Sequence, residues 1–331
     1  MTRRRRRLLW GTAIVLIIVS TGGFIFVKMI DSMIQKSLPE FLQAKSISTS
    51  FLQSVVRVEN LKLLSSPACN NLPMIETNVL QSAFSFQRRS VSSVRIDRAD
   101  IFLDRIRNHC LPQLKESDKS VHADYISKQG LDLIIDNAVL HLADHQKALF
   151  NAHLRIIPQD DQSYRIDHQS FRIDYYGLAI KMQRGSIVII PPKDPNGDFK
   201  KSGSAALMIE SDAVEKIPGI NSEKIQVLKG SIRASAQLAI GVGGVTVSGN
   251  VNLLNLKVHG ESLIKSPLPL LKLTPDALWP LAEDSQGKLN FTFTAKGHQS
   301  QIIELTGKAI RLAITAKIKA NIRKKIPIPI F

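Results

Sequence analysis

Apolar and polar residues alternate along most of the chain after residue 45, which is the pattern of strands that bury one face of a sheet. The apolar positions of the two clearest runs include Ile232, Ala234, Leu238, Leu289, Phe291 and Phe293. Similar runs lie at 55–63, 78–86, 94–103, 131–142, 149–157, 164–174, 178–182, 185–190, 204–209 and 245–258. The pattern therefore predicts a mainly β protein.

In two of these runs the apolar residues switch partway from one set of alternate positions to the other, which is a change of phase. The phase flips within 94–103, between Ile96 and Ala99, and within 245–258, after Leu253. A one-residue change of phase is what a β-bulge produces, and bulges bend and twist long strands. Because the strands follow one another without long helices between them, we expect an elongated, mostly antiparallel, strongly twisted or curved sheet, shaped like a groove.

An uncharged segment near the start predicts a transmembrane helix. Residues 8–27 are long enough to cross a bilayer core, and five consecutive arginines, 3–7, precede them. The apolar anchor residues are Leu8, Trp10, Ile14, Leu16, Ile18 and Phe24. A cleaved signal peptide is the alternative, but the run is long and no A-x-A-like cleavage site follows it. Since Lys and Arg stay on the cytoplasmic side, we expect a single-pass inner-membrane protein with most of its chain in the periplasm.

Helical spacing recurs on both sides of the strand-rich region. It predicts an amphipathic helix after the anchor, interrupted by Pro39, and a basic helix over 303–325 with isoleucines at every fourth position. The predicted organisation is a basic stub with a membrane anchor, an amphipathic helix, a β-rich extracytoplasmic domain, and a basic helix with a tail. Their bounds are 1–29, 30–45, 46–300 and 301–331.

Charge is concentrated at the two ends of the chain. The formal net charge is +16, and seven basic residues follow the last acid, Glu304. A large net positive charge makes nucleic acid a candidate partner. However, the arginine block adjoins a predicted membrane segment, where anionic headgroups are the nearest acids. No nucleic-acid-binding motif lies between the two blocks, so we expect a lipid bilayer as the partner and no nucleic acid.

The sequence shows no pattern of a reactive or metal-binding site. Cys69 and Cys110 could form one disulfide in an oxidising compartment or remain two thiols. His141 and His145 flank a carboxylate but have no third ligand, which favours solvated turn residues. No nucleophile or metalloprotease motif is present. We therefore expect a protein that is not an enzyme and that has no cofactor or metal.

Three segments resemble a known family. The strands at 55–63 and 94–103 follow a basic-flanked anchor and a short helix, and 287–297 fits the pattern G-x-L-x-F-x-F-x-x-x-G. Together they are similar to the AsmA-like family of envelope proteins, which includes TamB. The resemblance implies an inner-membrane-anchored β-structure whose concave apolar face holds phospholipid acyl chains.

The expected function is therefore lipid binding or transfer through an apolar β-groove in the cell envelope, with a possible envelope protein as partner. The groove candidates are the apolar positions named first, Ile232 to Phe293. Two alternatives remain open at this point. The apolar face could be an ordinary core closed by the helices at 30–44 and 303–325, or the chain could be a scaffold such as the N component of type II secretion.

Overall fold

The structure of the chain is a computed structural model. It describes residues 27–36, 38–85, 90–106, 110, 126–142, 145–159, 163–190, 200–218, 221, 225–241, 244–260, 279–280, 283–284, 286–298 and 301–325. The predicted anchor residues Leu8, Trp10, Ile14, Leu16, Ile18 and Phe24 lie outside this set. Among the described helices, none has the length and hydropathy needed to cross a bilayer.

The described chain is mainly β, as predicted, and its strands form an open, mostly antiparallel sheet. The strands are β1 (Leu42–Gln43), β2 (Ser46–Ser50), β3 (Val55–Leu64), β4 (Pro73–Ser85), β5 (Ser90–Phe102), β6 (Leu131–His141), β7 (Lys147–Pro158), β8 (Tyr164–Tyr175), β9 (Leu178–Ile190), β10 (Lys200–Ser211), β11 (Ile225–Gly241), β12 (Gly244–Gly260) and β13 (Lys288–Gly297). A long helix, α4 (Ile302–Lys325), follows β13. Where the sequence predicted one β-rich domain, the chain divides into two units, 1–146 and 147–331.

In the first unit, β3, β4, β5 and β6 pair in chain order, and both β1 and β2 pair with β3. The β5–β6 pair is parallel. Parallel neighbours need a long crossover connection, here the segment 103–130. Within this segment Cys110 forms a disulfide with Cys69, at an S–S distance of 2.04 Å, so the open question of the two cysteines is resolved as a bridge.

Of the two predicted bulges, the one in β12 is present, because the register of β11 with β12 shifts between Lys229 and Ser231, opposite Asn255. The prediction was wrong for β5, whose register with β4 and with β6 does not shift at Arg98. Arg98 in β5 and Asn255 in β12 have φ values of 54° and 50°, a left-handed conformation that is uncommon for residues other than glycine. Asn60 in β3 and Asn137 in β6 share this conformation. Because one left-handed residue turns the following side chains over, apolar residues on either side of it stay on the same face.

The segment predicted as an amphipathic helix over 30–45 differs in part. Residues 27–36 are helical, but Leu42–Gln43 form β1, which pairs with β3. Pro39 lacks a backbone N–H, so a helix does not continue through it easily. The prediction was therefore wrong for the second half of this segment. In contrast, α4 begins and ends within one residue of the predicted 303–325.

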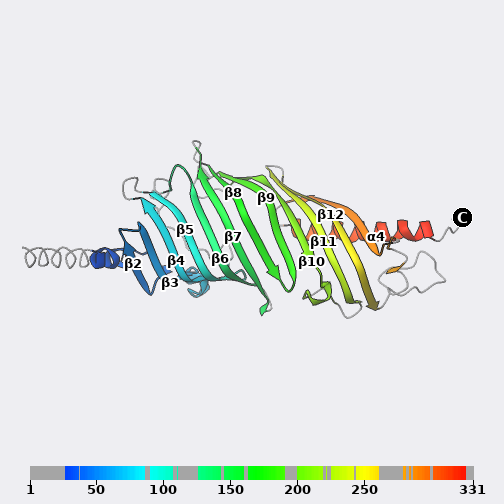
Figure 1. Cartoon of the computed structure of the whole chain (residues 1–331), viewed down its shortest axis with the longest axis horizontal. Coiled ribbons are helices and arrows are strands. Elements are labelled where there is room, and N and C mark those ends of the chain that lie inside the picture. The colour runs from blue at the N-terminus through cyan, green and yellow to red at the C-terminus, as the bar shows by residue number, and fades with distance from the viewer. Residues whose placement is uncertain are drawn as a thin grey trace, which may run out of the picture. The chain divides into compact units, whose positions relative to one another are not determined.

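In the second unit, β7 to β13 form an antiparallel meander in which each strand pairs with the next along the chain (Figure 1). β11 and β12 pair up to adjacent ends, with Gly241 opposite Gly244. Bulges in β8 and β9 shift the register near Leu154 and Ala206. α4 contacts β13 and, to a lesser degree, β12.

Candidate binding face

One row of paired residues crosses all seven strands of the second unit and is apolar throughout. Residues paired across strands lie on the same face of a sheet. The row, called the inner row, consists of Phe150, Ile173, Ile180, Ile209, Ala234, Val251 and Phe291. We call the face that carries it the inner face of the sheet.

The adjacent row points to the opposite side and is mainly polar. This outer row consists of Asn151, Arg172, Lys181, Met208, Ser235, Asn250 and Thr292. Successive side chains in a strand point to opposite faces. The two rows differ by one residue along each strand, so one row forms an apolar surface and the other a polar one. The sheet is therefore amphipathic across its whole width in this unit.

Ion pairs hold the cations of the outer face. Arg172 Nε donates to Asp174 Oδ2 at 2.6 Å, Arg165 Nε donates to Asp167 Oδ2 at 3.1 Å, and Lys181 pairs with Glu210. The hydrogen bond and the charge of Lys181 lower the pKa of the Glu210 carboxyl. The hydrogen bond and the charge of Asp174 raise the pKa of Arg172. This is the chemistry of a surface in contact with water.

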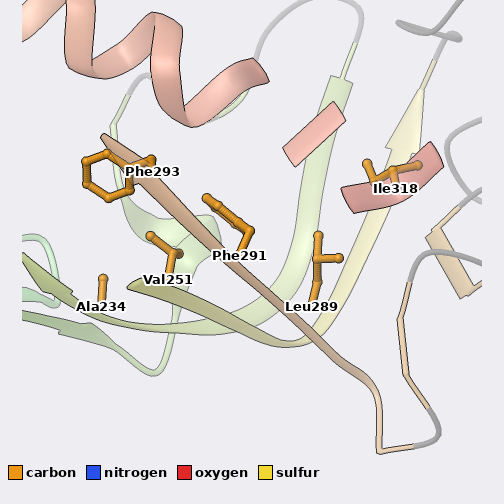
Figure 2. Packing of buried hydrophobic residues seen from close by; sticks show 6 residues of the cluster. All are labelled: Ala234, Val251, Leu289, Phe291, Phe293 and Ile318. Carbon is orange, nitrogen blue, oxygen red and sulfur yellow. The ribbon is translucent and has the colours of Figure 1, made fainter. Parts of the chain in front are cut away.

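At the β13 end, α4 covers the inner face and forms a core with it. Leu289 is 0% exposed and Phe291 is 5% exposed, and both pack in a cluster with Ile318 of α4. Figure 2 shows the side chains of β13 projecting toward the helix, with Val251 of β12 and Ala234 of β11 beside them. Three isoleucines of the predicted apolar stripe of α4, Ile310, Ile314 and Ile318, thus pack against the sheet.

Gly249 in β12 makes room for an aromatic ring in this core. It lies opposite Phe293, and a Cβ atom built on Gly249 would be 2.7 Å from Cε1 of the Phe293 ring and 2.6 Å from the Ser235 carbonyl oxygen. No real Cβ fits at those distances without movement of a neighbour. The ring of Phe293 therefore occupies space that any other residue at position 249 would need.

The structure places the six groove candidates on the inner face but covers most of them. Ala234, Leu289, Phe291 and Phe293 belong to the core cluster beneath α4, so they do not line an open groove. Ile232 packs at the edge of this cluster, and Leu238 is half-buried on β11. Alternation identified the face of these residues but could not reveal the helix above them.

The inner face of β7–β10 is different. Its large side chains are all half-buried, whereas those beneath α4 are buried. They are Phe150, Leu154, Ile156, Ile166, Phe171, Ile173, Ile180, Met182, Ile187, Ile189, Leu207 and Ile209. In the part of the chain that the structure describes, these strands make extensive contacts only with neighbouring strands. We call this surface the uncovered inner face.

Among the polar side chains of the uncovered inner face are His168 and, by their pairing, Tyr164 and Tyr175. His168 pairs with Leu154 across β7 and β8, and its Nε2 lies 2.7 Å from the backbone oxygen of Met182, next to the bulges of β8 and β9. The backbone contact ties the ring to the sheet. The Nδ1 atom of the same ring is buried and has no hydrogen-bond partner among the described residues.

The residues of the uncovered inner face were not among the groove candidates. Their apolar alternation was visible, because 149–157, 164–174, 178–182 and 204–209 were all predicted as alternating strands. However, alternation does not show which apolar stripe a helix covers. Among the described residues, no group of His, Cys, Asp or Glu is arranged to hold a metal ion.

The chain matches no protein-family model, and no curated protein matches its sequence.

Proposed function

We propose that this chain is a membrane-anchored extracytoplasmic protein that binds lipid acyl chains on its uncovered inner face and hands lipid on within the cell envelope. The observation that supports this most is the change in burial along the inner row. The row is apolar from Phe150 to Phe291, yet its buried members among the described residues, Ala234, Val251 and Phe291, all belong to the cluster that contains Ile318 of α4.

The chemistry of the face favours acyl chains as occupants. Its side chains are mainly aliphatic, and the cross-strand pairs repeat the same kind of side chain from β7 to β10. An acyl chain gains about 0.8 kcal/mol for each CH₂ group that it buries. A surface with few hydrogen-bonding groups suits a ligand that has few, because few polar groups are then left without a partner.

The anchor is the part of the proposal that comes from the sequence. The arginine block at 3–7 and the uncharged run at 8–27 support a single membrane-spanning helix with the body outside the cytoplasm. A sheet that is anchored in this way would lie next to the bilayer that supplies its lipid. Lipid would then need to travel only from the bilayer to the sheet.

A pair of charge substitutions on neighbouring residues tests this function. Leu207 and Met208 are adjacent in β10, and their side chains lie on the inner and the outer face respectively. The full chain, purified from cells in mild detergent, is analysed for bound phospholipid by native mass spectrometry. We expect phospholipid on the wild-type protein and on Met208→Asp, and its loss from Leu207→Asp.

A wild-type protein that is free of phospholipid at high purity would contradict the proposal. It would favour the scaffold alternative, in which the apolar face meets protein. Equal phospholipid content in the two variants would also contradict it, because bound lipid would then not depend on the inner face. Circular dichroism and a thermal unfolding curve on each variant show that both proteins are folded.

A further inference from the structure

The outward face of α4 carries a stripe of cations. Its exposed residues recur at helical spacing, and the basic ones among them are Lys308, Arg311, Lys319, Arg323 and Lys324. The only acid of the helix is Glu304, in its first turn. From residue 308 to residue 324 the stripe extends about 24 Å, at about 1.5 Å per residue.

None of these cations has an ion-pair partner among the described residues. Arg172 and Lys181 on the outer face of the sheet each contact a carboxylate, whereas none of the five side chains of the α4 stripe does so. A basic side chain without an acid nearby leaves its charge to attract an external anion. Five of them on one side of a helix form a strongly positive surface.

A shallow cleft of about 300 Å³ lies between α4 and the start of β13, beside the stripe. Besides Lys324 of the stripe, two more lysines line it, Lys288 and Lys317, together with two acids, Glu283 and Asp284. The two further lysines and the two acids balance in formal charge. The positive surface is therefore that of the stripe itself.

The shape of the surface indicates what kind of anion it meets. α4 uses its apolar side against β13, so it has no second apolar side to insert into a bilayer. Between the cations the outward face offers only small residues and Leu312, which is 64% exposed. A long, positive surface without a deep pocket fits a partner with dispersed negative charge better than a small ligand.

We propose that the outward face of α4 docks electrostatically on an anionic phospholipid surface. The inference relies on the proposed function only in placing the chain beside a membrane, and it does not need acyl chains to bind the sheet. α4 stays folded on β13 and meets the headgroups with its stripe. The contact should weaken as salt increases, because the charges are exposed to solvent.

A fluorescent label on α4 tests the docking. Ala316→Cys places a thiol on the exposed side of the helix, and Ser235→Cys places one on the exposed outer face of β11 as a control. The native cysteines are joined in a disulfide and do not react with the dye. Each full-length protein, held in zwitterionic nanodiscs and carrying a polarity-sensitive dye, is titrated with vesicles of phosphatidylcholine, with or without phosphatidylglycerol.

We expect a blue shift of the dye at position 316 only with vesicles that contain phosphatidylglycerol, and no shift at position 235. Combining Lys319→Glu with Arg323→Glu should weaken this binding at least about 25-fold, since each basic residue near an anionic surface contributes about fivefold. The control combines Lys229→Glu with Lys257→Glu, at exposed positions of β11 and β12, and should change it little.

No shift with anionic vesicles, or equal weakening by both charge-reversed pairs, would overturn the inference. So would a shift with polyglutamate or single-stranded DNA in the absence of one with vesicles. The outcome is separable from that of the proposed function. Vesicle docking without phospholipid on the purified protein contradicts the function alone, and bound phospholipid without docking contradicts the inference alone.

Discussion

The two ends of the inner row in the second unit have the same chemistry but different surroundings. At β13, Phe291 lies beneath α4 and is 5% exposed, whereas Ile180 in β9 is half-buried with no described helix above it. Both positions come from alternating strands, and the residue that follows each of them, Lys181 or Thr292, is polar. The difference shows that alternation determines which face is apolar, whereas a separate element determines whether that face is a core or a surface.

The dimensions of a helix explain why α4 covers only one end. A helix with its side chains is about 10–12 Å across, and strands in a sheet lie about 4.8 Å apart. One helix therefore covers about two strands, and α4 contacts β13 and β12. A meander of seven strands would need further helices to become a closed core. Among the described residues, the short 3-10 helix Val214–Lys216 also packs on this unit's sheet, against β11 and β12.

The largest expected contrast comes from the same substitution at the two ends. Leu289 is fully buried beneath α4, and Leu207 is half-buried on β10. Leu289→Ala should reduce the free energy of unfolding by about 3–5 kcal/mol, because it leaves a cavity in a packed core. Leu207→Ala should cost about 1 kcal/mol, since no packed layer is lost. Urea unfolding followed by the fluorescence of Trp279, which packs against the α4 core, measures both.

Equal losses in the two variants would mean that the inner face of β10 is packed as tightly as the face beneath α4. The uncovered inner face would then be a core, and lipid would have no surface to bind. This outcome would favour the closed-core alternative that the sequence left open.

A smaller contrast comes from glycines on the same face. Gly249→Ala should cost about 1–3 kcal/mol, because its Cβ meets the ring of Phe293 and a backbone oxygen. Gly185 in β9 is also close to a neighbour, with its Cβ 2.8 Å from Met182 Sδ, but that atom ends a flexible side chain. Gly185→Ala should therefore cost less than about 1 kcal/mol. Thermal unfolding of the two variants distinguishes a rigid neighbour from a mobile one.

The smallest effect is expected on the outer face. Lys181→Met removes the partner that lowers the pKa of Glu210, so this pKa should rise toward the ordinary value of a glutamate. A lowered pKa stabilises the fold above the ordinary pKa, and this contribution disappears as pH falls through the pKa of the folded state. The variant should lose this part of the acid dependence. NMR titration of labelled glutamate carboxyls measures the pKa, with Lys229→Met, at an exposed position of β11, as the control.

An unchanged pKa of Glu210 in Lys181→Met would show that the ion pair is not formed in solution. Because both side chains are exposed, little change in overall stability is expected from either lysine variant. The outer face should thus tolerate substitutions that the α4 core does not.

The sequence predicted those parts of the fold that depend on local pattern. The strands, the bulge near Asn255 and the helix α4 all follow from periodicity within a short window. The parallel pairing of β5 with β6 and the pairing of β1 with β3 could not be predicted in this way. These contacts join residues far apart in the chain, and no local pattern specifies them.

The residues of the candidate site also show that a local pattern does not specify contacts between distant segments. Phe291 and Ile180 give the same signal in sequence, and the clearest alternation, at 289–295, led to the residues that are most deeply buried. An i, i+4 stripe on α4 indicated that the helix has an apolar side but not which strands it covers. Only the packing of α4 on β13 separates the covered part of the inner face from the uncovered part.

Photocrosslinking at two adjacent residues shows directly whether phospholipid contacts the uncovered inner face. A benzophenone amino acid replaces Ile180, on the inner face, or Lys181, on the outer face, in the full chain within living cells. If lipid binds to the uncovered inner face, we expect a phospholipid adduct, identified by its mass, at position 180 and none at position 181. Equal labelling at the two positions, or protein adducts alone at position 180, would contradict it.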